Sequence, residues 1–528
     1  MAVNWGGLIC VAGFYVTILA VGVYASTKTK GITSINEVML AGRNIGLLLG
    51  VFTMIATWVG GGYINGTAQS VYDTGLWWTL APFAYSCSLI INGLFFAKTM
   101  REQGYVTLLD PFQIKFGRGM GGLLFLVALC GEIFYCSAIL TALGYTFSVI
   151  LDIESNIAII VSACIAMSYT LFGGLYSVAY TDVVQLVCLF FGLWLAIPFA
   201  FTNEHVTSIV ETSSTWRGTW DNRYAGVWCD YILQLLLGGL PWQEYFQRVL
   251  SAKSVRNAQI MSYAGAIGCL IMTIPSFIIG TIATSTNWTA TEYKQEITDS
   301  NIVLPLVLQY LTPKFVSIIG LGAVCAAVMS SADSTILSIS SMFSRNIYKH
   351  LIKQNASEKE VIWVMRISII VFGAISITLA ITVDSIYGLF YLCTDFVYVI
   401  LFPQLVSVVY IDFTNTYGSL SAYIIGLILR LGGGEQLLKL EPFIEYPFFD
   451  NGEQLFPFRT FAMLISFMIL ILVSRLFQYI FTKEILDKKW DVFKCVVNIQ
   501  REVEDTLKIK YVHVADRLDE NPSVDTTL

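Results

Sequence analysis

The sequence predicts an all-α membrane protein of about 13 transmembrane helices, with a core of two inverted five-helix repeats. Three observations lead to this fold class. Hydrophobic residues make up 56% of the chain, charged residues only 13%, and the mean hydropathy is +0.68. Apolar runs of spanning length recur along most of the chain. Two of these runs are interrupted by glycine or proline at corresponding positions.

Each predicted span is an apolar run of about 20 residues, the length at which a helix crosses the hydrocarbon core. The spans are 6–25, 46–71, 76–98, 119–151, 156–172, 176–202, 226–248, 257–286, 314–348, 361–382, 385–410, 415–431 and 459–484. The first lacks the basic start and cleavage site of a signal peptide, so we expect it to be retained as a helix.

The spans divide the chain into six regions. Residues 1–45 hold the first helix and a cytoplasmic loop, 46–202 the first repeat, 203–225 an extracellular loop, 226–410 the second repeat, 411–484 two peripheral helices with an extracellular loop, and 485–528 a cytoplasmic tail. The tail contains Glu504-Asp505-Thr506-Leu507, which is similar to acidic trafficking signals, but its composition favours an ordinary solvated segment.

The charges of the connecting loops predict the orientation. Lysine and arginine gather in alternate connections, at 28–43, 98–118, 248–256 and 345–359, and such loops are cytoplasmic. The opposite loops carry mainly acidic residues, and one of them holds the glycosylation sequon Asn287-Trp288-Thr289. We therefore expect the amino terminus outside the cell, the carboxyl terminus inside, and a glycan at Asn287.

The two interrupted spans contain Trp58-Val59-Gly60-Gly61-Gly62-Tyr63 and Gly238-Gly239-Leu240-Pro241-Trp242. A helix is broken inside a membrane only where the break is buried in protein or lines a cavity. Each break falls in the first span of a block of five, and an odd number of spans inverts the second block. Paired breaks in inverted repeats indicate the central binding site of a transporter, whereas glycines that merely allow close helix packing are the alternative.

Other classes of function are disfavoured. A sustained basic stripe is absent from the sequence, so no nucleic-acid partner is expected. A channel would show a repeated pore loop or rings of like charge, which the sequence lacks. The histidines, His205, His350 and His513, all fall in polar stretches, which argues against the nucleophile and base of a membrane enzyme.

Four runs carry a resemblance to a known family: ATWVGGGYINGTA at 56–68, GGLYSVAYTDVVQ at 173–185, GGLPWQEYFQRVLS at 238–251 and GLGAVCAAVMSSADSTILS at 320–338. Together they resemble the choline-transporting branch of the sodium/solute symporter family, from the first span to about residue 484. The resemblance implies a LeuT-type core and sodium-driven, chloride-dependent choline uptake. It also implies a plasma-membrane carrier of presynaptic terminals and synaptic vesicles that supplies acetylcholine synthesis and is blocked by hemicholinium-type inhibitors.

A sibling carrier for another small organic solute is the alternative, and the oligomeric state is left open. An anionic solute would require a cationic group at the site, whereas the broken spans place aromatic residues there.

Choline presents a quaternary ammonium that has no N–H, so a desolvated site must hold it through aromatic faces. Trp58 and Trp242 stand beside the two breaks, and by resemblance Tyr85 and Tyr135 complete an aromatic box. At the position of Tyr135 the resemblance leads us to expect tryptophan. Ordinary helix packing is the alternative for each of the four residues.

Ala327, Ser330 and Ser331 share one face of a predicted helix. The resemblance implies that this face, with backbone carbonyls near Ile55 and Trp58, forms the sodium site called Na2. Spacing alone would equally fit helix packing through small residues.

Carboxylates inside a membrane are costly and usually functional. By resemblance Asp182 belongs near the sodium pathway, and with Asp333 it is a candidate for a second ion site. Glu132 and Asp395 are weaker candidates, and either of them could pair with a buried donor instead. Glu244 stands where the resemblance suggests a small residue, and it either attracts the cation or, the favoured alternative, reaches water.

Overall fold

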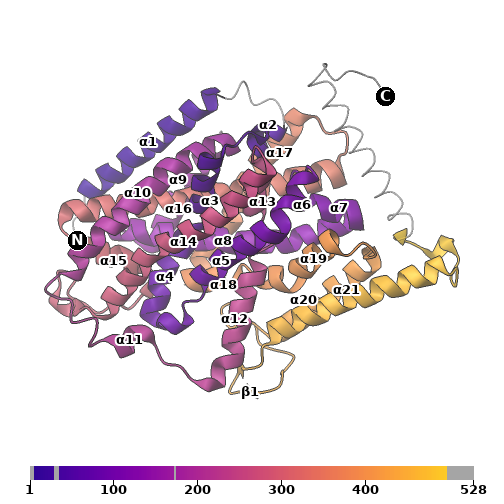
Figure 1. The fold of residues 1–528 in the computed structure, drawn as a ribbon. Coiled ribbons are helices and arrows are strands. Elements are labelled where there is room, and N and C mark those ends of the chain that lie inside the picture. The colour runs from indigo at the N-terminus through magenta and orange to yellow at the C-terminus, as the bar shows by residue number, and fades with distance from the viewer. Residues whose placement is uncertain (1–4, 29–34, 172–173, 384, 496–528) are drawn as a thin grey trace.

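The computed structural model describes residues 5–28, 35–171, 174–383 and 385–495. Helices form most of this part of the chain (Figure 1). The expected trafficking segment at 504–507 lies outside the described residues. The all-α fold class predicted from the sequence is confirmed.

The first half contains α1 (Trp5–Lys28), α2 (Ile35–Leu40), α3 (Leu47–Trp58), α4 (Gly61–Asp73), α5 (Ala81–Ile91), α6 (Ala97–Glu102), α7 (Asp110–Phe116), α8 (Arg118–Leu151), α9 (Ser155–Thr170), α10 (Leu175–Phe201) and α11 (Ser213–Arg217). A π-helical segment, η3 (Asn92–Phe96), joins α5 to α6 without a break. The 3-10 turns of this half are η1 (Ala41–Arg43) and η2 (Leu76–Trp78).

The second half contains α12 (Ala225–Gly238), α13 (Gln243–Ser251), α14 (Val255–Thr284), α15 (Val303–Tyr310), α16 (Lys314–Met342), α17 (Glu358–Thr382), α18 (Ile386–Leu392), α19 (Phe402–Tyr410), α20 (Thr416–Gly432) and α21 (Phe458–Thr482). The π-helical segments η7 (Phe343–Ile352) and η8 (Val397–Leu401) extend α16 and precede α19. The short strands β1 (Phe449–Asp450) and β2 (Glu453–Gln454) pair antiparallel in the loop before α21. The remaining 3-10 turns are η4 (Asn222–Tyr224), η5 (Trp288–Ala290), η6 (Ser300–Ile302) and η9 (Lys488–Trp490).

Within the described residues, eight helices are long and apolar enough to cross a membrane, and the bent pair α3 and α4 makes a ninth. Each of the predicted spans coincides with a helix or a broken helix. The predicted count of about 13 is not reached by length and composition alone. Four predicted spans account for the difference: the pair α12 and α13 is interrupted, α9 and α20 have only 16 and 17 residues, and the first span counts only over Ala12–Gly22.

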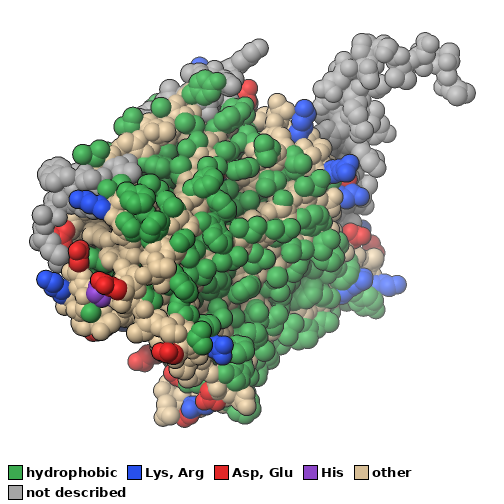
Figure 2. All heavy atoms as spheres, turned by 60° about the vertical axis from the view of Figure 1, so that its left-hand side comes forward, with side chains coloured by type: hydrophobic (Ala, Val, Ile, Leu, Met, Phe, Trp, Pro, Cys, Tyr) green, Lys and Arg blue, Asp and Glu red, His purple; other side chains and the backbone are tan. Residues whose placement is uncertain are grey.

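The surface agrees with a lipid environment. Figure 2 shows a broad face covered by apolar side chains, with charged side chains gathered at its margins. Large apolar residues such as Phe191, Trp363 and Leu472 are exposed along their helices. A water-soluble protein does not present a continuous apolar face of this kind.

Helix α16 lies at the centre of the packing. Every residue from Gly320 to Met342 is buried, and the helix packs against α8 and α10. By contrast α20 and α21 lie side by side at one edge of the molecule (Figure 1). A helix that is buried on all sides is where polar side chains meet protein groups rather than lipid.

A buried polar cluster joins the short helix α7 to η7. The Asp110 carboxylate accepts hydrogen bonds from the Val106 backbone N–H at 2.8 Å and from Asn346 Nδ2 at 2.9 Å, and it pairs with Arg345 at 3.3 Å. Burial by itself would raise the pKa of Asp110, but Arg345 and these hydrogen bonds outweigh it and lower the pKa to about 2. Two segments far apart in the sequence are therefore held together by one ionised carboxylate.

Candidate functional site

The first broken helix bends by 47° between α3 and α4. The break leaves the backbone carbonyls of Ala56 and Thr57 without helical partners, and Ser331 Oγ on α16 donates to both at 3.2 Å. Gly60 is required here because a Cβ atom at this position would collide with the Ser331 side chain. The glycines of the predicted break therefore allow α16 to reach the open helix end.

The second break separates α12 from α13 and is stabilised by side chains. Trp242 Nε1 donates to the Gly238 carbonyl at 2.9 Å, and Asn92 Nδ2 donates to the Leu240 carbonyl at 3.2 Å. A Cβ atom on Gly238 would lie 2.6 Å from the Thr394 carbonyl oxygen, so only glycine fits. Both breaks predicted from the sequence are thus present and are satisfied within the protein.

The two breaks meet at a small pocket lined by buried aromatic side chains. The structure brings all four residues of the predicted box, Trp58, Tyr85, Tyr135 and Trp242, to its wall. The remaining residues of the wall are Thr57, Glu244, Phe390 and Cys393.

Phe390 on α18 lies between Tyr85 and Tyr135 and connects the aromatic side chains of the two breaks. Its ring centroid lies 4.9 Å from that of Tyr85 and 5.9 Å from that of Tyr135, while Tyr135 lies 5.5 Å from Trp242 and Tyr85 lies 5.6 Å from Trp58. We call these five side chains the aromatic cage. The sequence reasoning missed Phe390 because 385–410 has the composition of an ordinary apolar span.

The cage holds little free space. It leaves a volume of about 10 Å³ for the centre of a water molecule, which is room for about one water. A larger guest requires the rings to move apart. The arrangement suits a site that closes around its ligand.

Glu244, in the first turn of α13, lies in the wall of the cage and is only 2% exposed. The expectation that it reaches water is therefore wrong: the first turn of α13 is buried among the core helices. Glu132 on α8, three residues before Tyr135, is also 2% exposed and interacts with Glu244. Two acidic side chains thus accompany the aromatic rings.

The two serines expected at one sodium site face different groups. Ser331 donates to the carbonyls of the first break, as described above, whereas Ser330 Oγ donates to the Asp182 carboxylate on α10. Thr53 on α3 donates to the other oxygen of Asp182. Oxygen groups thus gather at two places along α3, one at Thr53 and one at the carbonyls of Ala56 and Thr57.

The other expected sodium ligands lie close by. The Ile55 carbonyl accepts the backbone N–H of Val59 at 2.9 Å and therefore remains part of the helix. Trp58 ends α3, and Ala327 is buried on α16 one turn before Ser331. Carbonyl and hydroxyl oxygens of this kind are the ligands that hard cations prefer.

Asp182 and Asp333 have different surroundings. Asp182 faces the Arg248 guanidinium at 3.8 Å, and both groups are fully buried. Asp333 instead accepts a hydrogen bond from Thr170 Oγ1 on α9 at 2.6 Å. The oxygen cluster of Thr53, Asp182 and Ser330 is held by two hydrogen bonds, and Asp182 accepts both of them.

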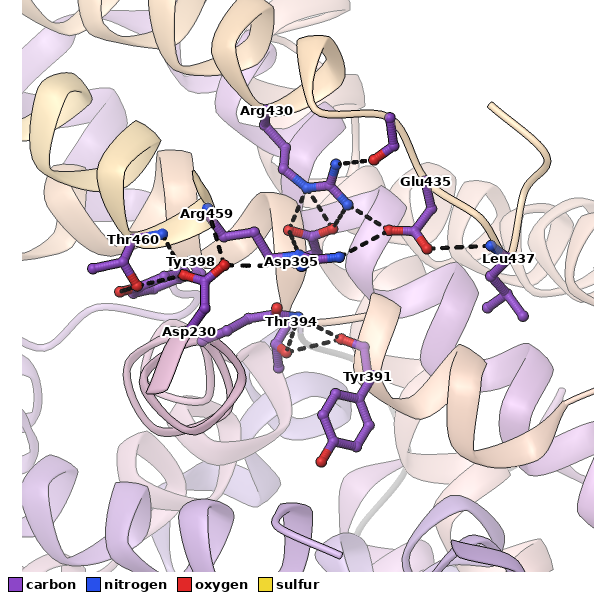
Figure 3. Close-up of polar contacts among 12 residues, drawn as sticks. Asp230, Tyr391, Thr394, Asp395, Tyr398, Arg430, Glu435, Leu437, Arg459 and Thr460 are labelled. Carbon is purple, nitrogen blue, oxygen red and sulfur yellow. Dashed lines mark hydrogen bonds and ion pairs between the residues drawn. The ribbon is translucent and has the colours of Figure 1, made fainter. Parts of the chain in front are cut away.

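Asp395 belongs to a buried charge cluster outside the cage. Figure 3 shows Arg430 and Arg459 lying between the carboxylates of Asp230, Asp395 and Glu435. The cluster adjoins two cavities of about 460 and 490 Å³, lined in part by residues 219–231, which include the start of α12, and by residues 433–455 before α21. Of the alternatives open for Asp395, pairing with a buried donor is the one observed, and it fastens α20 and α21 to the core.

The predicted glycosylation residue lies on the surface. Asn287 is exposed in the loop after α14, and Thr289 Oγ1 donates to Asn287 Oδ1 at 2.8 Å. Trp288 between them is buried and anchors the loop through its Nε1 bond to the Ala283 carbonyl at 2.9 Å.

Broken helices that meet at a central cavity define a secondary membrane transporter. The fold agrees with a solved structure of a Na⁺-coupled sialic acid symporter in a substrate-bound, outward-open state, with a TM-score of 0.73 at 18% identity over 89% of this chain and 98% of that one. The chain belongs to the sodium:solute symporter family, whose model matches residues 38–426. Its relatives in this family are transporters and not enzymes.

Relatives of high identity extend over almost the whole chain. A high-affinity choline transporter 1 of Drosophila melanogaster is 55% identical over 95% of this chain and 83% of the relative. The protein of the same name from Homo sapiens is 51% identical over 98% and 93%. A Bacillus subtilis osmoregulated proline transporter is 26% identical over 70% and 77%. Family membership supports co-transport of sodium by a multi-pass membrane protein.

Proposed function

We propose that this chain takes up choline across the plasma membrane by sodium-coupled symport. The observation that carries the proposal is the aromatic cage between the two helix breaks, because aromatic faces bind a quaternary ammonium that can donate no hydrogen bond. The buried acids Glu244 and Glu132 favour a cation over an anion at this place. The names of the relatives at 51–55% identity support choline as that cation.

Sodium binds, in this proposal, at the first break, through the carbonyls of Ile55 and Trp58, the Ala327 carbonyl and the hydroxyls of Ser330 and Ser331. Asp182 with Thr53 and Ser330 forms a second ion site beside it. The surroundings of the two serines support two separate ion sites. Ser331 donates to the open carbonyls of the first break, whereas Ser330 donates to the Asp182 carboxylate. Asp333 stays a candidate for a second site, and its carboxylate accepts a hydrogen bond from Thr170.

Transport proceeds by alternating access between the two inverted repeats, 46–202 and 226–410. The support is the contrast between the narrow cage and the large cavities of about 460 and 490 Å³ beside residues 219–231 and the loop 433–455. In the proposed orientation these loops face outward, as does Asn287 with its glycan. The amino terminus then lies outside and the carboxyl terminus in the cytoplasm.

Several finer properties follow only from the resemblance to the choline-transporting branch. They are chloride dependence, block by hemicholinium-type inhibitors, location at presynaptic terminals and synaptic vesicles, and supply of choline for acetylcholine synthesis. The alternative function is symport of another small organic solute, as the 26% identical proline transporter illustrates.

The test is uptake of labelled choline into cells that express the chain, measured in sodium, in lithium, and in sodium with gluconate in place of chloride. We expect uptake in sodium chloride, loss in lithium, and reduction in gluconate. Labelled proline and a sugar, supplied under the same conditions, test the alternative. Uptake of choline that is equal in sodium and lithium would contradict sodium coupling.

A further inference from the structure

Glu244 is a buried acid whose acidic neighbour is Glu132, and among the described residues no lysine or arginine forms an ion pair with it. Its side chain lines the aromatic cage, and neither of its carboxylate oxygens has a hydrogen-bond partner in the structure. A buried carboxylate that no donor satisfies is strongly unfavourable. Such a group is expected where a ligand completes its hydrogen bonds.

The arginine one turn further along α13 does not fulfil this role. Arg248 donates from Nη2 to Ser334 Oγ at 2.5 Å and from Nη1 to Gln247 Oε1 at 3.2 Å, and it lies 3.8 Å from the Asp182 carboxylate. Its guanidinium therefore points to the ion side of the break. Among the described residues, no ion pair joins Glu244 to an arginine or lysine.

The neighbouring acid strengthens the demand for a cation. Glu132 comes from α8 and interacts with Glu244, and one of its own oxygens also lacks a hydrogen-bond partner. Acids from two helices thus meet beside the cage, whose wall consists of Glu244, the five aromatic side chains, Thr57 and Cys393. A cationic ligand would meet π faces on one side and carboxyl oxygen on the other.

The two kinds of wall recognise different features of a cation. An aromatic face attracts any organic ammonium, including a quaternary one. A carboxylate gains a charge-assisted hydrogen bond only from an ammonium that has an N–H. We propose that Glu244 is a specificity-determining residue through which the cage binds alkylammonium ions with an N–H, the tertiary, secondary and primary amino alcohols, in addition to quaternary choline.

The inference rests on the proposed function, because it assumes that the cage is the site of an organic cation. The test uses four compounds that differ only in the number of N-methyl groups: choline, N,N-dimethylethanolamine, N-methylethanolamine and ethanolamine. The measurement is equilibrium binding to the purified full-length protein in sodium, for the wild type and for Glu244→Gln. Glutamine keeps the shape of the side chain and removes its charge.

We expect the wild type to bind dimethylethanolamine within about tenfold of choline, because one charge-assisted hydrogen bond offsets the lost methyl contact. In Glu244→Gln the affinity ratio of dimethylethanolamine to choline should fall by about tenfold or more. Trp242→Phe is the matched control, since a smaller π face should weaken all four compounds by similar factors.

An unchanged ratio in folded Glu244→Gln would overturn the inference. If that variant does not fold, the wild type decides, because a preference for choline above about a hundredfold leaves no role for a hydrogen bond to Glu244. If choline binds but the affinity ratio of dimethylethanolamine to choline is the same in Glu244→Gln and the wild type, this inference alone is contradicted. Binding of the amines without choline sinks the proposed choline uptake alone, and binding of none of the four sinks both.

Discussion

The Tyr135 hydroxyl donates a hydrogen bond to the backbone oxygen of Thr57, 3.1 Å away, and thereby joins the aromatic cage to the break in the first helix. The same oxygen accepts the hydroxyl of Ser331 at 3.2 Å. One carbonyl group therefore connects α3, α8 and α16. This oxygen therefore links the wall of the cage to Ser331, a ligand of the proposed sodium site.

Tyr135→Phe should weaken choline binding by about fivefold, the effect of one lost hydrogen bond of about 1 kcal/mol. The ring and its contacts with Trp242 and Phe390 are retained, so folding should be normal. The Tyr63 ring packs against Phe390, but its hydroxyl contacts Pro82 and Ser86 outside the wall of the cage, so Tyr63→Phe serves as the control. Binding that is equal in Tyr135→Phe and the wild type would mean that the bond to Thr57 has no part in recognition.

Two substitutions at Trp242 distinguish a role in helix packing from a role in cation recognition. Phenylalanine and leucine both lose the Nε1 bond to Gly238, so the comparison between them isolates the π face. A desolvated cation–π contact is worth about 2 kcal/mol, or roughly thirtyfold in affinity. We expect Trp242→Phe to keep measurable binding of a quaternary ammonium inhibitor at the cell surface and Trp242→Leu to lose most of it. Equal binding by the two variants would remove the aromatic basis for choline.

Ser331→Ala should raise the sodium concentration that half-saturates uptake by about tenfold, because it removes one oxygen next to the open carbonyls of the first break. Ser330→Ala should do the same through the Asp182 cluster. Ser340→Ala is the matched control, since this buried serine of α16 has an Oγ without a hydrogen-bond partner. Sodium activation like that of Ser340→Ala in both variants would place the ion elsewhere.

Arg430→Met should lower the free energy of unfolding by about 3 to 5 kcal/mol, since it leaves Asp395 buried with one cationic partner fewer. Thermal unfolding in detergent, followed by the loss of monodisperse protein, measures the effect. The double variant Arg430→Met with Asp395→Leu should recover part of the loss. A single variant as stable as the wild type would show that Arg459 alone satisfies the cluster.

Asp110 gives a pH dependence with a defined sign. Its folded pKa of about 2 lies below the ordinary value of 3.8, so its contribution of about 2 kcal/mol is present above pH 4 and is lost as the pH falls toward 2. Asp110→Asn should therefore unfold at a lower temperature than the wild type at pH 7 and pH 5. The difference should shrink below about pH 4. A difference that does not change with pH would assign the effect to shape instead of charge.

The helix breaks and the cage could largely be predicted from the sequence. Gly60 and Gly238 can be recognised as helix breaks because each lies in a cluster of glycines inside an apolar span, where a helix is readily interrupted. A tryptophan beside each break indicates the site. Phe390 carries no such mark, since an aromatic residue in 385–410 looks like any lipid-facing one. Only the packing of α18 against α4 and α8 reveals it.

The ion ligands show where sequence reasoning ends. Ser330 and Ser331 follow Ala327 by three and four residues, so the spacing assigns all three to one broad face, but about 100° of helical rotation separates the two serine side chains. The structure directs one to Asp182 and the other to the first break. The burial of Glu244 was also hidden, because burial of α13 depends on helices distant in the sequence. The division into repeats and the ligand sets remain predictions.

The shared carbonyl of Thr57 has a thermodynamic consequence. If sodium and substrate both bind as proposed, each acts on the same short segment of backbone, and a shift of that segment toward one ligand changes its fit to the other. Free-energy linkage then requires reciprocity: the factor by which sodium tightens choline equals the factor by which choline tightens sodium. Titrations of sodium and of choline, each with the other ligand absent and then saturating, must give the same coupling factor. Tyr135→Phe removes one of the two hydroxyl bonds to the Thr57 carbonyl and should change the factor by the same amount in both titrations.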